Sequence, residues 1–199
     1  MTPNALFQLA LFAILLTALA VPLGRYMAAV YTGRAWRAQR LLGPLERGLY
    51  AAAGLRGEDM TWQGYAGALL VFNTVGMLFL YGLLRGQAAL PFAGAGFPAV
   101  GPDVALNTAV SFVTNTDWQA YGGETTLAPT TQMLGLTVQN FLSAATGMAV
   151  LVAVIRGFTA DRSPGLGNFW VDLVRSTLYI LLPLSLVVAL ALVAEGVPQ

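Results

Sequence analysis

The chain has 199 residues, of which 57% are hydrophobic and 10% are charged. This composition is typical of an integral membrane protein and excludes an ordinary soluble domain. The sequence contains no Cys and no His, which excludes disulfides, thiolate or imidazole metal sites, and nucleophile pairs that depend on either residue. The formal net charge of +1 argues against nucleic acid as a partner.

The first apolar run, residues 5–23, is long enough to cross a bilayer. A secretory signal peptide begins with positively charged residues, but here no Lys or Arg precedes the apolar run. Arginines follow it instead, at Arg25, Arg34, Arg37 and Arg40. This pattern predicts a retained transmembrane helix within residues 1–30, with its N-terminus outside.

A long polar connection follows at residues 31–61. Pro44 suits the first turn of a short helix, and such a helix could lie on the inner surface of the membrane. A solvated loop with a single helical turn explains the same residues equally well. Both interpretations place the connection outside the bilayer.

Three further spans are predicted at residues 62–84, 131–155 and 176–194. Trp62 and Tyr81 lie near the two ends of the second span, where interfacial aromatic residues are common. The third span is uncharged throughout. The sequence therefore predicts an all-α integral membrane protein.

Polar side chains of the third span fall on one face when placed at 100° per residue. These residues are Gln132, Gln139, Ser143 and Thr146, with Asn140 at the edge of the face. Because lipid cannot satisfy polar groups, the stripe should face water or the protein interior. It could line a water-filled cavity or contact neighbouring helices, and the two roles are compatible.

The segment between the second and third spans contains a short predicted helix, residues 103–113, with Asp103 as its N-cap. Residues 114–119 then show no apolar period. A short helix followed by polar, extended backbone is typical of a re-entrant pore loop, in which carbonyl oxygens replace the hydration shell of an ion. An ordinary outer loop with one capped helical turn fits the pattern equally well.

Arginine placement predicts the orientation. The residues that follow the first, second and third apolar runs, 24–61, 85–130 and 156–175, contain six, one and three Arg residues. The positive-inside rule therefore places connections 31–61 and 157–175 in the cytoplasm, and both termini and residues 114–119 outside. The outer connection also holds acidic residues that could raise the local cation concentration, namely Asp103, Asp117 and Glu124.

The sequence resembles a known family, the potassium-binding subunits of Kdp-type potassium-transporting ATPases. The matching segments are NTAVSFVTNT at 107–116, WQ at 118–119, GETTL at 123–127, GLTVQNFLSAA at 135–145, DLVR at 172–175 and PLG at 22–24. The resemblance runs along the whole chain and is densest through residues 105–147. It favours the pore-loop interpretation strongly.

The resemblance implies the fold of the potassium transporter superfamily, with four helix–pore helix–filter–helix repeats around one filter and an extra N-terminal helix. Residues 1–30 would be the extra helix, and residues 62–156 the first repeat. Residues 176–199 would be the opening helix of a second, truncated repeat. The chain would then represent roughly the first third of such a subunit, with one of its pore loops.

The resemblance also implies the site residues. The filter backbone would be Val113, Thr114, Asn115, Thr116 and Asp117. Residues at the mouth would be Trp118, Gln119 and Glu124, and those lining the cavity Gln132, Gln139, Asn140 and Ser143. Asp117 departs from the family, in which Asn is expected, and its carboxylate could either strengthen cation binding or pair locally.

The function implied by the resemblance is binding and translocation of potassium across the bacterial cytoplasmic membrane, with no cofactor besides the transported ion. The implied partners are a P-type ATPase catalytic subunit, which would hydrolyse ATP, and small accessory subunits. The chain itself shows no catalytic motif. Two alternatives are a stand-alone or Trk-like cation channel subunit and a non-conducting membrane anchor subunit.

Overall fold

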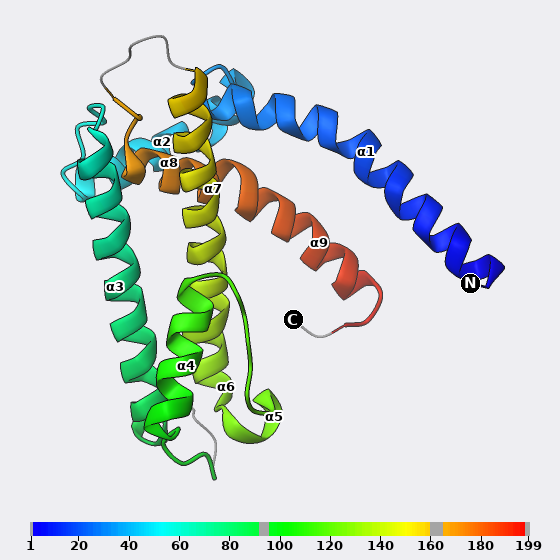
Figure 1. Ribbon diagram of the computed structural model, residues 1–199, viewed down its shortest axis with the longest axis vertical. Helices are drawn as coiled ribbons and strands as arrows, with labels where there is room; N and C mark the ends of the chain where they lie inside the picture. The colour runs from blue at the N-terminus through cyan, green and yellow to red at the C-terminus, as the bar shows by residue number, and fades with distance from the viewer. Residues whose placement is uncertain (1, 92–95, 160–164, 198–199) are drawn as a thin grey trace. The chain divides into compact units, whose positions relative to one another are not determined.

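The computed structural model describes residues 2–91, 96–159 and 165–197, and this part of the chain is helical without strands (Figure 1). Four helical stretches are long and apolar enough to cross a membrane: Pro3–Tyr31, Trp62–Ala89, Pro129–Thr159 and Phe169–Ala194. The prediction of an all-α protein with four potential spans is confirmed. Residues 160–164 of the predicted connection 157–175, and residues 198–199, lie outside the described residues.

The chain divides into two compact units, residues 1–53 and 54–199. The first unit contains α1 (Pro3–Tyr31) and α2 (Trp36–Ala52). Of the two interpretations of the polar connection, the structure shows the helix, but α2 begins eight residues before Pro44, so Pro44 lies inside it rather than in its first turn. A proline inside a helix removes one N–H from the ladder and crowds the carbonyl four residues earlier, while the Tyr50 hydroxyl supports the following turn by donating to Glu46 Oε1 (2.7 Å).

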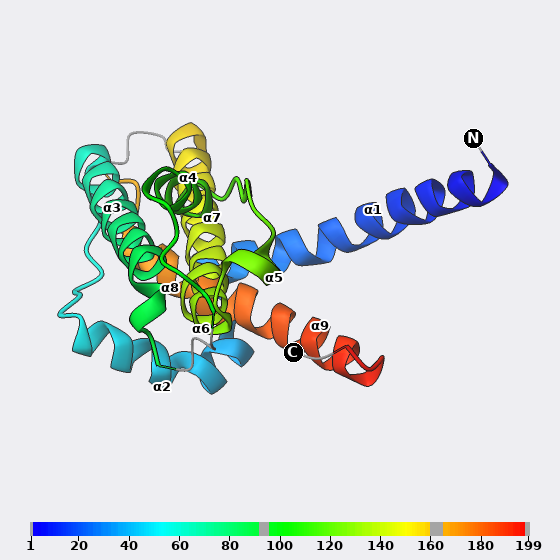
Figure 2. The same cartoon turned by 90° about the horizontal axis from the view of Figure 1, so that it is seen from below.

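The second unit is built around two long helical segments with a short helix between them. Its first half contains α3 (Trp62–Gly86), η1 (Gln87–Ala89), α4 (Pro102–Val113) and α5 (Gly123–Thr126). The second long segment is formed by α6 (Pro129–Thr131), the π-helical η2 (Gln132–Thr137) and α7 (Val138–Thr159). Figures 1 and 2 show α4 beside α3 and α7, and after α4 the chain turns and returns to the end where α4 began.

The N-terminus of α4 differs from the prediction. Gly101 is its N-cap and Pro102 its first residue, while Asp103 lies in the first turn without a capping bond. Proline favours the first helical position because its φ is already helical and its missing N–H needs no partner there. Asp103 still stabilises the helix, since a carboxylate in the first turn faces the positive end of the dipole.

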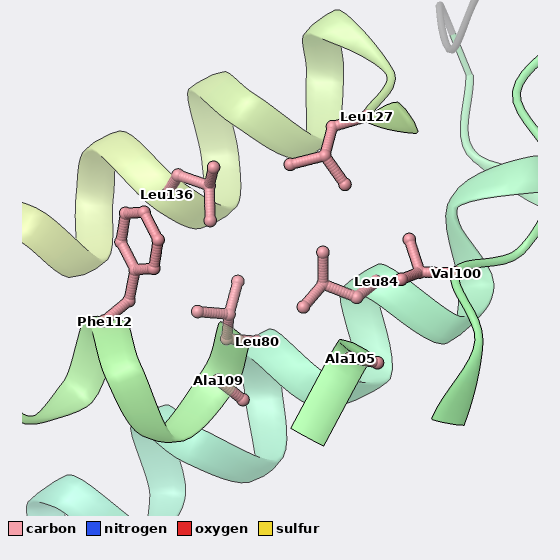
Figure 3. Close-up of a cluster of buried hydrophobic side chains, with 8 residues drawn as sticks. All are labelled: Leu80, Leu84, Val100, Ala105, Ala109, Phe112, Leu127 and Leu136. Atoms are coloured by element: carbon pink, nitrogen blue, oxygen red, sulfur yellow. The ribbon is translucent and has the colours of Figure 1, made fainter. Parts of the chain in front are cut away.

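A cluster of buried apolar side chains fixes α4 against its neighbours (Figure 3). Its members are Leu80, Leu84, Val100, Ala105, Ala109, Phe112, Leu127 and Leu136. Ala105 and Ala109 are small and fully buried, so the α4 backbone can approach α3 closely. Gly135 plays a similar part in η2, because a Cβ atom there would lie 2.7 Å from Leu83 Cδ2.

A second cluster joins the opposite ends of α3 and α7 to α8 (Phe169–Arg175). The fourth helical stretch continues from α8 through the π-helical η3 (Ser176–Leu181) into α9 (Leu182–Ala194). The prediction that this stretch starts at residue 176 was therefore wrong by seven residues. Asn168 caps α8 by accepting from the N–H groups of Trp170 and Val171 (3.1 and 3.3 Å).

Candidate functional site

The backbone after α4 turns its N–H groups back toward the last turn of that helix. Five consecutive N–H groups, those of residues 114–118, have acceptors there. The bonds run from Thr114 N to Val110 O (3.0 Å), from Asn115 N to Phe112 O (3.3 Å), from Thr116 N and Asp117 N to Ser111 O (2.9 and 3.3 Å), and from Trp118 N to Ser111 Oγ. The end of α4 is thus capped by the loop that follows it.

This arrangement also sets the direction of the carbonyl groups. In a trans peptide the N–H and the C=O point in opposite directions, and the described residues contain no cis peptide bond. The carbonyl oxygens of residues 113–117 therefore point away from the end of α4. Within the described part of the chain none of these oxygens accepts a hydrogen bond. The loop presents a row of five unpaired oxygens that an ion could bind.

Two residues make this backbone path possible. Asn115 and Asp117 have φ values of 57° and 58°, in the left-handed region. Asn and Asp enter this region more readily than other non-glycine residues, for which it costs roughly 1–2 kcal/mol. Because the left-handed residues Asn115 and Asp117 flank Thr116, the successive N–H groups of the loop can all turn toward acceptors in the last turn of α4. The residue types at 115 and 117 thus support the geometry of the row.

The threonine hydroxyls of the loop are engaged locally. Thr114 Oγ1 donates to Val110 O at 2.9 Å and lies 2.8 Å from Thr116 Oγ1. Because the Thr114 proton is directed to Val110, the Thr116 hydroxyl is the donor to Thr114 Oγ1. The two side chains brace the turn, and the backbone oxygens remain the free groups of the loop.

The predicted residues at the mouth are exposed. Trp118 is 69% exposed, and Gln119 and Glu124 also lie on the surface. Trp118 borders an open pocket of about 260 Å³ whose other lining residues are Asn107, Val110, Ser111, Thr114 and Thr116. Beyond the mouth, burial raises the pKa of the Tyr121 hydroxyl above its ordinary value.

The four predicted cavity residues occupy different environments. Ser143 is 2% exposed and donates to Asn115 Oδ1 at 3.1 Å. Gln139 is 3% exposed and lies against Gly76 of α3. Asn140 is exposed. The Nε2 of Gln132 donates to Gly123 O at the start of α5 and to Leu127 O directly after it (3.2 and 3.1 Å). The structure thus brings Ser143, but not the other three, into hydrogen-bond contact with the loop.

Sequence reasoning missed one residue that holds the loop from the other side. Gln87, directly after α3, is fully buried. Its Nε2 donates to Pro98 O and to Thr126 O (2.9 Å), and its Oε1 accepts from the N–H of Ala128 (3.2 Å). One amide therefore joins the segment that enters α4 to the segment that follows the loop. A Gln at the end of an apolar run gives no signal of this role.

A side-chain metal site of the usual kind is not present in the described residues, since no group of three Cys, His, Asp or Glu is close enough to hold an ion. Asp117 and Glu124 are both exposed and have no ion pair among the described residues. Unpaired backbone oxygens such as those of residues 113–117 are a different kind of ligand, the kind that ion filters use to replace the hydration shell of a cation.

The family model described as KdpA, potassium-transporting ATPase A subunit, matches residues 10–199. The chain belongs to this family. Relatives from Sorangium cellulosum and Rhodospirillum centenum are each 58% identical over 200 residues, and a relative from Methylococcus capsulatus is also 58% identical. All three are named as potassium-transporting ATPase potassium-binding subunits.

The alignments include the whole of this chain but only 34%, 35% and 33% of the three relatives. The chain thus spans about a third of the length of the KdpA relatives that it matches. The resemblance identified in the sequence is confirmed at the level of the family. The matched residues include α4, the loop that follows it and α7.

Proposed function

We propose that residues 113–117 form part of a potassium filter in an ATP-driven potassium uptake transporter. The observation that carries the proposal is the row of five carbonyl oxygens directed away from α4. Membership of the KdpA family and the names of the relatives support potassium as the ion. The chain would bind and translocate potassium, while a separate P-type subunit would hydrolyse ATP.

The chemistry of such a filter follows from the hydrogen bonds. An ion that enters the filter loses its water and needs oxygen atoms at fixed positions in place of its hydration shell. Here the N–H groups of residues 114–118 are bound to α4, so the peptide units are oriented before the ion arrives. The negative end of the α4 dipole adds a field that favours a cation.

One loop provides only part of an ion's coordination shell, so the filter requires further loops. Because the matched relatives are about three times as long as this chain, these loops would come from the same subunit in the full transporter. Small accessory subunits and the P-type subunit would complete the complex. We call the protein together with these partners the assembled transporter.

The orientation is part of the proposal. The arginine distribution favours a bacterial cytoplasmic membrane location with the N-terminus outside and the loop opening to the outer side. The return of the chain to the end where α4 begins supports a re-entrant loop, with the pore helix at α4. Potassium would thus enter from outside, where Asp103 and Glu124 favour cations.

Two substitutions of Asp117 test whether the backbone binds the ion. Asp117→Gly keeps the left-handed conformation, whereas Asp117→Val opposes it by roughly 1–2 kcal/mol. We expect Asp117→Gly to keep the potassium KM of the assembled transporter within about threefold of the parent. Asp117→Val should raise it by about tenfold and weaken the rejection of sodium. Uptake of rubidium and sodium tracers measures the KM and the rejection of sodium.

The outcome that contradicts the proposal is an unchanged potassium KM and unchanged sodium rejection in Asp117→Val, at equal amounts of assembled transporter. That result would favour the alternative of a non-conducting anchor subunit. Equal increases of the potassium KM in Asp117→Gly and Asp117→Val would also contradict the proposal, because the side chain rather than the backbone would then bind the ion.

A further inference from the structure

We infer that Ser143 is a positioning residue for the filter, which sets potassium over sodium selectivity by holding the side chain of Asn115. This inference deepens the proposed function and rests on it. Ser143 itself need not touch the ion. It acts through the Asn115 amide, which belongs to the residue in the middle of the row of carbonyl oxygens.

The contact links two elements that are far apart in the sequence. Ser143 lies on α7, 28 residues after Asn115, and its Oγ is 3.1 Å from Asn115 Oδ1. The remaining hydrogen bonds of residues 114–118 run within the loop or to the last turn of α4. Within the described residues, the Ser143 bond is therefore the one hydrogen bond that ties this loop to a different helix.

The position of Asn115 makes this bond consequential. Its φ of 57° is a left-handed conformation that a side-chain anchor stabilises. The peptide units on either side of Asn115 carry the oxygens of Thr114 and Asn115. If the side chain were released, these two units could rotate and the oxygens could move inward around a smaller ion. A fixed Asn115 therefore keeps these oxygens at a spacing that suits potassium rather than the smaller sodium ion.

Burial fixes one partner of the Ser143 bond. Ser143 is 2% exposed and held by the packing of α7, whereas Asn115 is exposed, so the bond is partly buried and ties an exposed residue to the interior. The same hydroxyl lies 3.3 Å from Asn140 O in its own helix, which gives the proton a second, longer acceptor. Removing the hydroxyl would leave Asn115 Oδ1 without this donor while the α7 backbone keeps its own bonds.

The chain offers a matched control one turn further along α7. Thr146 is also buried, at 5% exposed, and its hydroxyl donates to Leu142 O of the same helix at 2.7 Å. It makes no contact with the loop in the hydrogen bonds of the described residues. Thr146→Val therefore removes a buried hydroxyl from the same helix without disturbing Asn115.

The test uses the assembled transporter with Ser143→Ala, Ser143→Thr and Thr146→Val. The loss of one partly buried hydrogen bond predicts that Ser143→Ala lowers the selectivity for potassium over sodium by about fivefold. Ser143→Thr should restore this selectivity because it keeps a hydroxyl, and Thr146→Val should leave it unchanged. The readout is the ratio of KM values for rubidium and sodium uptake, at equal transporter amounts.

A second experiment separates a role through Asn115 from a general effect on packing. In an Asn115→Gly background the side-chain acceptor is absent, so adding Ser143→Ala should change the selectivity ratio no further. Additive losses would overturn the inference. Should the Ser143→Ala transporter not assemble, Ser143→Cys keeps a similar volume with a weaker donor and should lower the ratio in the same direction.

The results also separate this inference from the proposed function. If Asp117→Val impairs potassium uptake but Ser143→Ala and Ser143→Cys match the parent, the inference fails and the filter remains. If Asp117→Val has no effect, the proposed filter fails as well. A loss of selectivity in Thr146→Val equal to that in Ser143→Ala would show that both hydroxyls act in helix packing, and it would overturn the positioning role of Ser143.

Discussion

Arg156 at the end of α7 binds Asp172 of α8 through two hydrogen bonds, one from each terminal nitrogen, with Nη2 at 2.9 Å from Oδ1. Asp172 is 1% exposed, and the Tyr65 hydroxyl of α3 lies 3.1 Å from its Oδ2. Arg156 also donates to Leu166 O at 3.0 Å. The pair therefore joins α3, α7 and α8 near the C-terminal end of α7.

Arg156→Ala leaves the buried Asp172 carboxylate without its cation. We expect this variant to lose about 3 kcal/mol of stability, as is typical when one partner of a buried ion pair is removed. Replacing both residues, as Arg156→Met with Asp172→Leu, should cost less than Arg156→Ala alone. Thermal denaturation of the assembled transporter ranks the stabilities of these variants, with Arg40→Ala at an exposed position as the control. A double variant less stable than Arg156→Ala would contradict this account.

Gln87 joins the segment before α4 to the segment that follows the loop through one buried amide. Gln87→Met keeps the volume but leaves the Ala128 N–H without its acceptor, which costs about 1–3 kcal/mol. We expect faster hydrogen exchange at residues 126–128 and a higher potassium KM. Gln63→Met, at an exposed position of α3, should change neither. Unchanged exchange in Gln87→Met would show that the amide does not fix the loop.

Gly76 provides the space that Gln139 occupies between α3 and α7. A Cβ atom at Gly76 would lie 3.0 Å from Gln139 Oε1. Gly76→Ala should therefore lower stability by about 1–2 kcal/mol through overpacking. At Gly82 of the same helix a Cβ would meet nothing within 4 Å, so Gly82→Ala should be neutral or stabilising. Equal denaturation midpoints for both variants would contradict this prediction.

The carboxylate of Asp117 is exposed and lies in an open environment. Asn tolerates the left-handed conformation as Asp does, so Asp117→Asn changes the charge and preserves the backbone. Because salt screens an exposed charge, we expect the potassium KM to change by less than about threefold at physiological ionic strength. The change should shrink further at high salt. A tenfold, salt-independent loss would show that the carboxylate coordinates the ion directly.

The spans could be predicted from the sequence because long apolar runs leave few alternatives to a membrane helix. The start of the fourth helix at Phe169 could not, because Asp172 and Arg175 look like connection residues until Arg156 is known to bind Asp172. Local charge patterns do not report a partner sixteen residues away. The structure also places Asp103 inside the first turn of α4, a detail that Pro102 determines.

For the loop after α4, the sequence predicted irregular backbone but not its geometry. The absence of an apolar period at residues 114–119 indicated irregular backbone, and the proposal that its carbonyls bind an ion came from the family resemblance. The left-handed conformations of Asn115 and Asp117, and the repeated use of Ser111 as an acceptor, depend on the exact path of the chain. Such a path follows from tertiary contacts with α3 and α7, which periodicity does not encode.

The proposed function requires that the backbone carbonyls of residues 113–117 bind potassium. Within residues 1–199 the pairs Val113–Thr114 and Thr116–Asp117 are each unique in sequence, as is Asp172–Leu173 at the opposite end of the unit. Because the assembled transporter contains further sequence, only residues 1–199 are labelled, by ligating a labelled segment to the unlabelled remainder. Pairwise labelling with carbonyl ¹³C on the first residue and ¹⁵N on the second then isolates three carbonyls for solid-state NMR in lipid.

We expect the Val113 and Thr116 carbonyl signals to shift saturably as potassium is added. They should not shift with an equal concentration of sodium, and the Asp172 carbonyl should remain unchanged throughout. Val113 and Thr116 signals that stay constant across the potassium titration, while the transporter takes up potassium normally, would contradict the account.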